Sequence, residues 1–273
     1  MIELVHYLPR LDQKLIELLS SLSEEDWNKQ TIAKKWKVKD VVAHLLDGNI
    51  RTLSGLKDGY QPKAPQINSY QDLLGYLNQL NADWVKAMQR VSPAFLIELL
   101  KFTGEPFYHY YTSIDPHAKA TYAVAWAGEN ESENWMHIAR EYTEKFLHQQ
   151  QIRDAVDKQG IMTEEFYIPF LDTCMFALPF TLRNTKTENG NILVMNVSGD
   201  VNGSWYVQFD GHQWNLSKEA PQGVIICTIT IDAQASWKLF SKSLRAYDLK
   251  DEIKIQGDQQ IGVVALEMVS FMA

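Results

Sequence analysis

The sequence predicts an α+β protein, in which a four-helix bundle is followed by a small domain of strands and helices. Up to residues 157–166 the apolar residues recur at spacings of three and four, as on one face of a helix. Beyond that stretch, alternation of apolar and polar residues and turn signals dominate. The 273 residues suffice for two domains of ordinary size. We therefore expect a helical domain over residues 1–158 and an α+β domain over residues 166–273.

Four principal helices are expected in the first domain. Leucines three or four positions apart, from Leu4 to Leu19, indicate the first of them. The predicted helices cover residues 2–20, 39–58, 69–91 and 131–156. Ser92 and Pro93 begin a shorter apolar segment, and residues 104–131 are interpreted as a long, irregular surface connection. Helices joined in this way favour a bundle.

The second domain is expected to contain both strands and helices. The runs 192–197, 205–209 and 224–231 are rich in β-branched and aromatic residues, which is typical of strands. Asp210-Gly211 predicts a hairpin between 205–209 and 212–216, because Asp and Gly accept the positive φ angles of a tight turn. A short strand at 253–255 and helices at 232–244 and 259–271 complete the prediction.

Composition excludes several classes of protein. The net charge of −8 argues against a nucleic-acid surface and favours a small-molecule or protein partner. No uncharged apolar run approaches about 20 residues, so no membrane span is expected, and the N-terminus does not resemble a signal peptide. Cys174 and Cys227 lie in apolar runs and are expected to be inert buried thiols. We expect a cytoplasmic protein, since sparse cysteine suits a reducing compartment. We expect a monomer or a dimer.

One group of residues has the composition of a metal site. His44 follows Val41 by three positions, so it should lie on or beside the inward face of its helix. Glu144 and His148 are four apart and can converge on one ion. One carboxylate and two imidazoles, with positions left open for water, is the ligand set of catalytic zinc sites and resembles that of non-haem iron.

The spacing alone leaves alternatives open. A Glu and a His four apart occur on many helices, usually on a solvated face, and a helical wheel puts this pair on the flank of the apolar stripe. His137 and Glu141 lie on the same side of the predicted helix, so either could replace one of the ligands. His109, His117 and His212 are interpreted as surface or loop residues.

Two stretches resemble a known family. Residues 36–45 (WKVKDVVAHL) look like the first metal-ligand helix of the DinB-like superfamily, in particular of its mycothiol-dependent maleylpyruvate isomerase branch. Residues 140–155 (REYTEKFLHQQQIRDA) resemble the other ligand helix of that branch, with its Glu-x3-His pattern. The resemblance implies a four-helix bundle that binds a divalent ion on His44, Glu144 and His148. Zinc is the first expectation, with nickel or iron as alternatives.

The resemblance covers most of the chain, with one departure. Gln151 stands where the pattern usually has Asp, which would alter hydrogen bonding around the ligands without removing one. The C-terminal half resembles the small domain that accompanies the isomerase bundle, which is similar to sterol-carrier folds. The residues that carry this second likeness are 177–180 (ALPF), 203–205 (GSW), Trp237 and 255–258 (IQGD).

The resemblance also implies a chemistry. Family members use the metal to bind or activate a low-molecular-weight thiol, since coordination deprotonates a thiol whose free pKa is about 8.5. The thiolate then adds to a small electrophile. In an isomerase the adduct rotates and eliminates the thiol, whereas in a transferase the thiol stays attached.

The general base is not assigned by the sequence. Glu141 is a candidate for a residue that orients a metal ligand. The alternative is that Glu141 is an acidic residue on the solvated surface. The competing hypothesis is a non-catalytic protein that binds a structural metal and a small ligand. The two hypotheses differ in whether the metal ion keeps a coordination position whose water can be exchanged.

Overall fold

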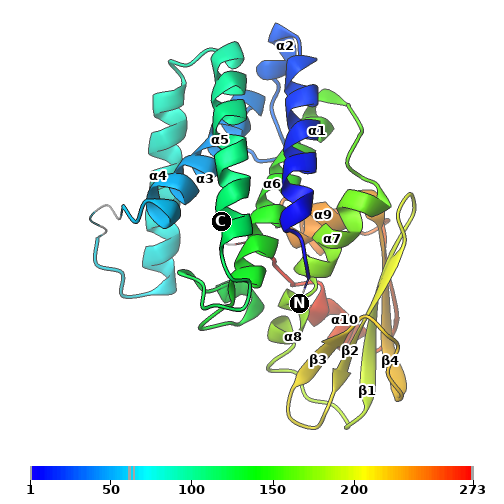
Figure 1. Cartoon of the computed structure of the whole chain (residues 1–273). Helices are drawn as coiled ribbons and strands as arrows, with labels where there is room; N and C mark the ends of the chain where they lie inside the picture. Colours follow the sequence, from blue (N-terminus) through cyan, green and yellow to red (C-terminus); the bar gives the residue numbers. More distant parts are fainter. Residues whose placement is uncertain (1, 61–62, 64, 272–273) are drawn as a thin grey trace. The chain divides into compact units, whose positions relative to one another are not determined.

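The computed structural model describes residues 2–60, 63 and 65–271 and contains two compact units. The first consists of Met1–Tyr122 and Glu133–Ile161, and the second of Ala123–Ser132 and Met162–Met272. The segment Ala123–Ser132 is grouped with the second unit, although it lies within the first domain expected from the sequence. Each unit is described separately below (Figure 1).

The first unit is helical, as the apolar spacing predicted. Its helices are α1 (Leu8–Ser20), α2 (Glu24–Trp27), α3 (Val38–Arg51), α4 (Tyr70–Met88), α5 (Pro93–Ser113) and α6 (Asn134–Val156), with a short 3-10 turn η1 (Val5–Tyr7) before α1 and a π-helical segment η2 (Thr52–Lys57) after α3. Helix α1 packs against α5 and α6, and α3 packs against the same two helices, which closes a four-helix bundle. Helix α4 packs on the outside of this bundle against α3.

Helix α5 corrects the prediction for the middle of this unit. The expected irregular connection after residue 104 is helical up to Ser113. Gly104 and Pro106 lie inside this helix, where an interior proline costs about 3 kcal/mol. The helix nevertheless continues, because a buried stripe crosses the proline and packs in the bundle. The stripe consists of Leu96, Leu100, Thr103, Phe107 and Tyr111.

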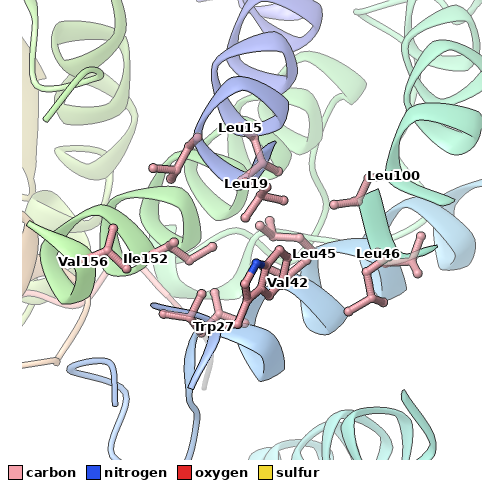
Figure 2. Close-up of a cluster of buried hydrophobic side chains, with 13 residues drawn as sticks. Leu15, Leu19, Trp27, Val42, Leu45, Leu46, Leu100, Ile152 and Val156 are labelled. Atoms are coloured by element: carbon pink, nitrogen blue, oxygen red, sulfur yellow. The ribbon is translucent and has the colours of Figure 1, made fainter. Parts of the chain in front are cut away.

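The bundle core is continuous across its four helices. Figure 2 shows Leu15 and Leu19 of α1 facing Val42 and Leu45 of α3, with Ile152 of α6 beside them. All are buried, and burying one such side chain contributes about 1.5–3 kcal/mol. The core therefore holds α3 and α6 together, and these are the helices that carry the predicted metal ligands. Among the described residues, no helix combines the length and the hydropathy needed to cross a membrane.

The second unit contains a five-stranded sheet in the order β3-β2-β1-β4-β5. Its elements are η3 (Ala125–Ala127), α7 (Glu164–Cys174), α8 (Ala177–Thr181), β1 (Asn191–Ser198), β2 (Gly203–Phe209), β3 (Trp214–Ser217), β4 (Val224–Asp232), α9 (Ala233–Phe240), η4 (Ala246–Asp248), β5 (Ile253–Gly257) and α10 (Gln259–Ala265). Strand β1 is parallel to β4, and the other neighbours are antiparallel. Helices α8, α9 and α10 pack on the sheet (Figure 1). The predicted α+β class is confirmed.

The predicted hairpin forms between β2 and β3. The Asp210 carboxylate accepts hydrogen bonds from the backbone N–H groups of His212 and Gln213, both at 2.9 Å, and Gly211 has φ +92°. The turn is therefore longer than predicted, and β3 begins at Trp214 instead of His212. The other four predicted strands are confirmed to within a few residues.

Both cysteines are buried in the second unit, as expected from the apolar runs around them. Burial raises the pKa of Cys227 to about 11 and raises that of Cys174 further. Because the thiolate is the reactive form, we expect neither thiol to react with Ellman's reagent at pH 8 in the native protein. Both should react after unfolding in guanidinium chloride. If one thiol of the native protein reacts with the reagent, the structure around that cysteine must open.

Candidate metal centre

His44, Glu144 and His148 come together between α3 and α6. One ligand atom from each of the three side chains can be chosen so that all three lie within 4.8 Å of one another. Among the described residues this is the only group of three or more His, Cys, Asp or Glu side chains with such geometry. The His44 and His148 rings meet edge to face, with centroids 4.6 Å apart, and Glu144 Oε2 lies 3.3 Å from His148 Nε2.

Helix packing explains this convergence. Val41 and Leu45 of α3 are in the bundle core, and His44 lies between them in sequence on the flank of that face. On α6, the four-residue spacing of Glu144 and His148 puts both on one side of the helix. The contact between α3 and α6 then brings His44 to that side.

The environment of His44 keeps its imidazole neutral. Burial lowers the pKa of His44 well below its usual value, and the neighbouring His148 and Arg51 act in the same direction. Trp36 packs against the ring with centroids 4.7 Å apart. His44 Nδ1 is buried without a hydrogen-bond partner among the described residues. A neutral imidazole with an unpartnered nitrogen is suited to a cation, which would supply the missing partner.

His148 is oriented by Gln151. Gln151 Oε1 lies 2.9 Å from His148 Nδ1, so the amide oxygen accepts a hydrogen bond when that nitrogen carries the proton. In this tautomer the lone pair is on Nε2, the nitrogen that faces Glu144. Metal-binding histidines usually make such a hydrogen bond with their second nitrogen. Gln151, which stands where the resembled pattern usually has Asp, therefore contacts His148 directly.

One side of the triad is open. The Glu144 side chain is 35% exposed, so the group is not sealed from solvent. Gly48 lies one helical turn after His44, and a Cβ atom built on it would meet no other atom within 4 Å. Space is therefore available beside His44.

A second polar cluster lies on α6, about one turn before the triad. Arg140 Nη2 is 2.7 Å from Glu141 Oε1 and 2.8 Å from His137 Nε2. Tyr111 approaches the same His137 nitrogen at 3.5 Å, and its hydroxyl is 3.4 Å from that of Thr52, the first residue of η2. This cluster contains Glu141 and His137, the two residues that the sequence left open as further ligands or partners.

The charges in this cluster compensate one another. Burial alone would raise the pKa of Glu141, but the Arg140 guanidinium and His137 hold it well below its usual range. Burial also lowers the pKa of His137, with Arg140 adding to that effect and Glu141 opposing it, and in its neutral form the imidazole can accept the hydrogen bond from Arg140. The negative charge of Glu141 is therefore balanced mainly by Arg140.

The other histidines examined by sequence lie elsewhere. His109 pairs with Glu105 at 3.3 Å across an exposed turn of α5, with the same four-residue spacing as the triad pair. His117 and His212 are exposed. Trp36 was assigned no role from the sequence, and Tyr111 was placed in an aromatic connection that either covers the site or serves packing. Trp36 stands directly before α3 within the recognised motif, whereas no spacing links Tyr111 to α6.

Comparison with known proteins identifies the family. Residues 8–153, more than half of the chain, match the family described as the mycothiol maleylpyruvate isomerase N-terminal domain. The chain belongs to this family. The predicted membership of the DinB-like, maleylpyruvate isomerase-type group is thereby confirmed. No curated protein matches the sequence.

Solved structures support the same fold over most of the chain. A crystal structure of the mycothiol-dependent maleylpyruvate isomerase is 10% identical, with a TM-score of 0.54. A histidine-to-alanine mutant of such an isomerase is 8% identical, with a TM-score of 0.56. Each alignment covers 93% of this chain and 92% of the other. At this identity the likeness shows the fold, which includes the C-terminal unit of this family member.

Proposed function

We propose that this family member is a metal-dependent enzyme that activates a low-molecular-weight thiol for isomerisation or S-transfer on a small electrophile. His44, Glu144 and His148 would hold one divalent ion, with zinc as the expected metal. The observation that carries the proposal is the convergence of three protein ligands beside open space. Three ligands and a free position are the arrangement of catalytic zinc sites, whereas structural sites are closed by four protein ligands.

The protein residues around the triad have separable roles in this proposal. A bound divalent ion would lower the pKa of a coordinated thiol and so supply a thiolate at neutral pH. Gln151 orients His148, and Trp36 covers one side of both imidazoles, at 4.7 Å from His44 and 6.0 Å from His148. The exposed side of Glu144 and the space at Gly48 leave room for the thiol.

The thiol then acts as a recycled catalyst in an isomerase. Its thiolate adds to one carbon of a conjugated double bond, which becomes a single bond and rotates. Elimination restores the double bond in the other geometry and releases the thiol. Mycothiol and maleylpyruvate, the pair in the name of the related isomerase, are the first combination to assay.

Thiol binding is tested with the cobalt(II)-substituted protein. Addition of 2-mercaptoethanol should produce the near-ultraviolet charge-transfer band of a cobalt–thiolate bond, and ethylene glycol, its oxygen analogue, should not. The band should be absent in His148→Ala. It should persist in His109→Ala, which removes the histidine of the exposed pair with the same spacing.

Two outcomes would contradict the enzyme. A cobalt spectrum of a four-coordinate protein site that thiols leave unchanged would indicate a closed, structural ion. Thiol binding that survives in His148→Ala would place the thiol elsewhere. Either result would favour the alternative of a non-catalytic protein that binds a metal and a small ligand.

Gln151 should tune the affinity for the metal. Gln151→Leu removes the acceptor for His148 Nδ1, and the loss of such a partner lowers metal affinity by about 10–100-fold. Gln151→Glu supplies a carboxylate acceptor and should raise the affinity. Competition with a chromophoric zinc chelator measures both changes. The matched control is Gln150→Leu, because Gln150 is also buried on α6 and its Oε1 has no partner among the described residues. Equal affinities in the two leucine variants would rule out the orienting role.

A further inference from the structure

A pocket in the helical unit lies outside the metal centre. It has a volume of about 360 Å³ and is lined mainly by α1 and α5, with Asn49 of α3 at its inner end. This volume is at the lower end of the range of small-molecule sites, about 300–1,000 Å³. The triad residues come from α3 and α6 and are not among its lining residues, so the proposed thiol chemistry does not account for it.

A buried ion pair forms the polar end of this pocket. Lys145 of α6 is only 8% exposed, and its Nζ donates to Asp12 at 2.9 and 3.2 Å and to Asn49 Oδ1 at 2.9 Å. The ammonium also lies 4.3 Å from the centre of the Phe107 ring. Lys145 is therefore committed to these partners and is poorly placed to bind an anion.

Asp12 has acceptor capacity left over. An ionised carboxylate offers about four lone-pair sites, of which Lys145 uses two. The Asp12 side chain is 21% exposed and lines the pocket. Two further charged residues line the pocket, Glu105 and the exposed Lys101. Because Glu105 already pairs with His109, Asp12 is the lining carboxylate with acceptor sites to spare.

The remaining wall is shaped for an apolar body. Leu15, Ile16, Leu100 and the Tyr108 ring line it. Gly104 keeps the space between α1 and α5 open, because a Cβ atom there would already lie 3.4 Å from Asp12 Oδ2. A larger side chain at this position would project into the pocket.

We infer that this pocket binds a small organic ammonium compound, with the cationic head on Asp12 and the apolar body between α1 and α5. The recognition is a charge-assisted hydrogen bond, which is about twice as strong as a neutral one. An alcohol of the same shape can make only the weaker bond, and a carboxylate is repelled.

Three isosteric probes test this assignment: benzylamine, benzyl alcohol and benzoate. Titrations of the full chain, followed by protein-observed NMR, should give saturable binding of benzylamine at pH 7. Benzyl alcohol should bind about tenfold more weakly. Benzoate should not bind. Equal binding of benzoate, or no saturable binding of benzylamine, would overturn the inference.

Substitution of Gly104 locates the site. Gly104→Leu should abolish benzylamine binding by filling the pocket, and the added leucine is a better helix former than glycine. Gly75→Leu is the matched control, since Gly75 is an exposed glycine within α4 whose Cβ would contact nothing within 4 Å. Benzylamine that binds Gly104→Leu as it binds the wild type would place the amine elsewhere, for example on the metal, and would also overturn the inference.

Discussion

Replacing His148 with alanine is expected to weaken zinc binding by at least about 100-fold. Loss of a partner that merely orients a ligand costs about 10–100-fold, and this change removes a ligand itself. His148 is buried, and its Nε2 faces Glu144, so a neighbouring side chain cannot easily take its place. Elemental analysis of wild type purified without added metal should show about one equivalent of metal per chain, and the variant should show little.

The control for this experiment distinguishes metal binding at the triad from unspecific metal binding to other histidines. His109→Ala removes an exposed histidine from a Glu-x3-His pair on α5 and should leave the metal content unchanged. His44→Ala should behave like His148→Ala, because the two ligands come from different helices and both are needed. A wild-type protein that contains no metal and takes up none on titration would refute the metal centre.

Removing the buried lysine should cause the largest loss of stability. Lys145→Met leaves the Asp12 carboxylate and the Asn49 carbonyl without their donor inside the bundle. Breaking a buried ion pair on one side costs about 3–5 kcal/mol. We expect the lower end, about 3 kcal/mol, because Asp12 is 21% exposed and water can reach it. Urea unfolding followed by circular dichroism measures the change.

A surface lysine provides the comparison. Lys14 pairs with Glu17 on the outside of α1, with both side chains about half exposed. Lys14→Met should lose no more than about 1 kcal/mol, since exposed pairs contribute about 0–1 kcal/mol. The double variant Asp12→Asn/Lys145→Met should recover part of the loss, because it removes the uncompensated charge. Equal effects of Lys145→Met and Lys14→Met would show that the interior pair is well solvated.

Local patterns in the sequence determined most of the elements. The leucine spacing predicted α1, and the alternating β-branched runs predicted the strands of the sheet, because each pattern follows from the geometry of one element. The family resemblance was carried by two short stretches for the same reason, since the ligands in each stretch share one helix face.

Helix α5 shows where local patterns failed. Residues 104–113 were interpreted as an irregular connection, but they continue the helix, because Gly104 and Pro106 are outweighed by packing of the buried stripe against α1 and α3. That packing joins residues far apart in the chain, so it cannot be predicted from a local sequence pattern. The same contacts show that the fourth helix of the bundle is α5 and not α4.

The sequence by itself determined the composition of the candidate site, with His44, Glu144 and His148 named from spacing and resemblance. Only the tertiary structure decided their surroundings: the packing of Trp36 against His44, the contact of Gln151 with His148, and the pairing of Glu141 with Arg140. It also produced the Asp12–Lys145 pocket, which no motif indicated. The physical reason is that spacing specifies the face of a helix on which a side chain lies. Its partners, burial and charge depend on which other helix packs against that face.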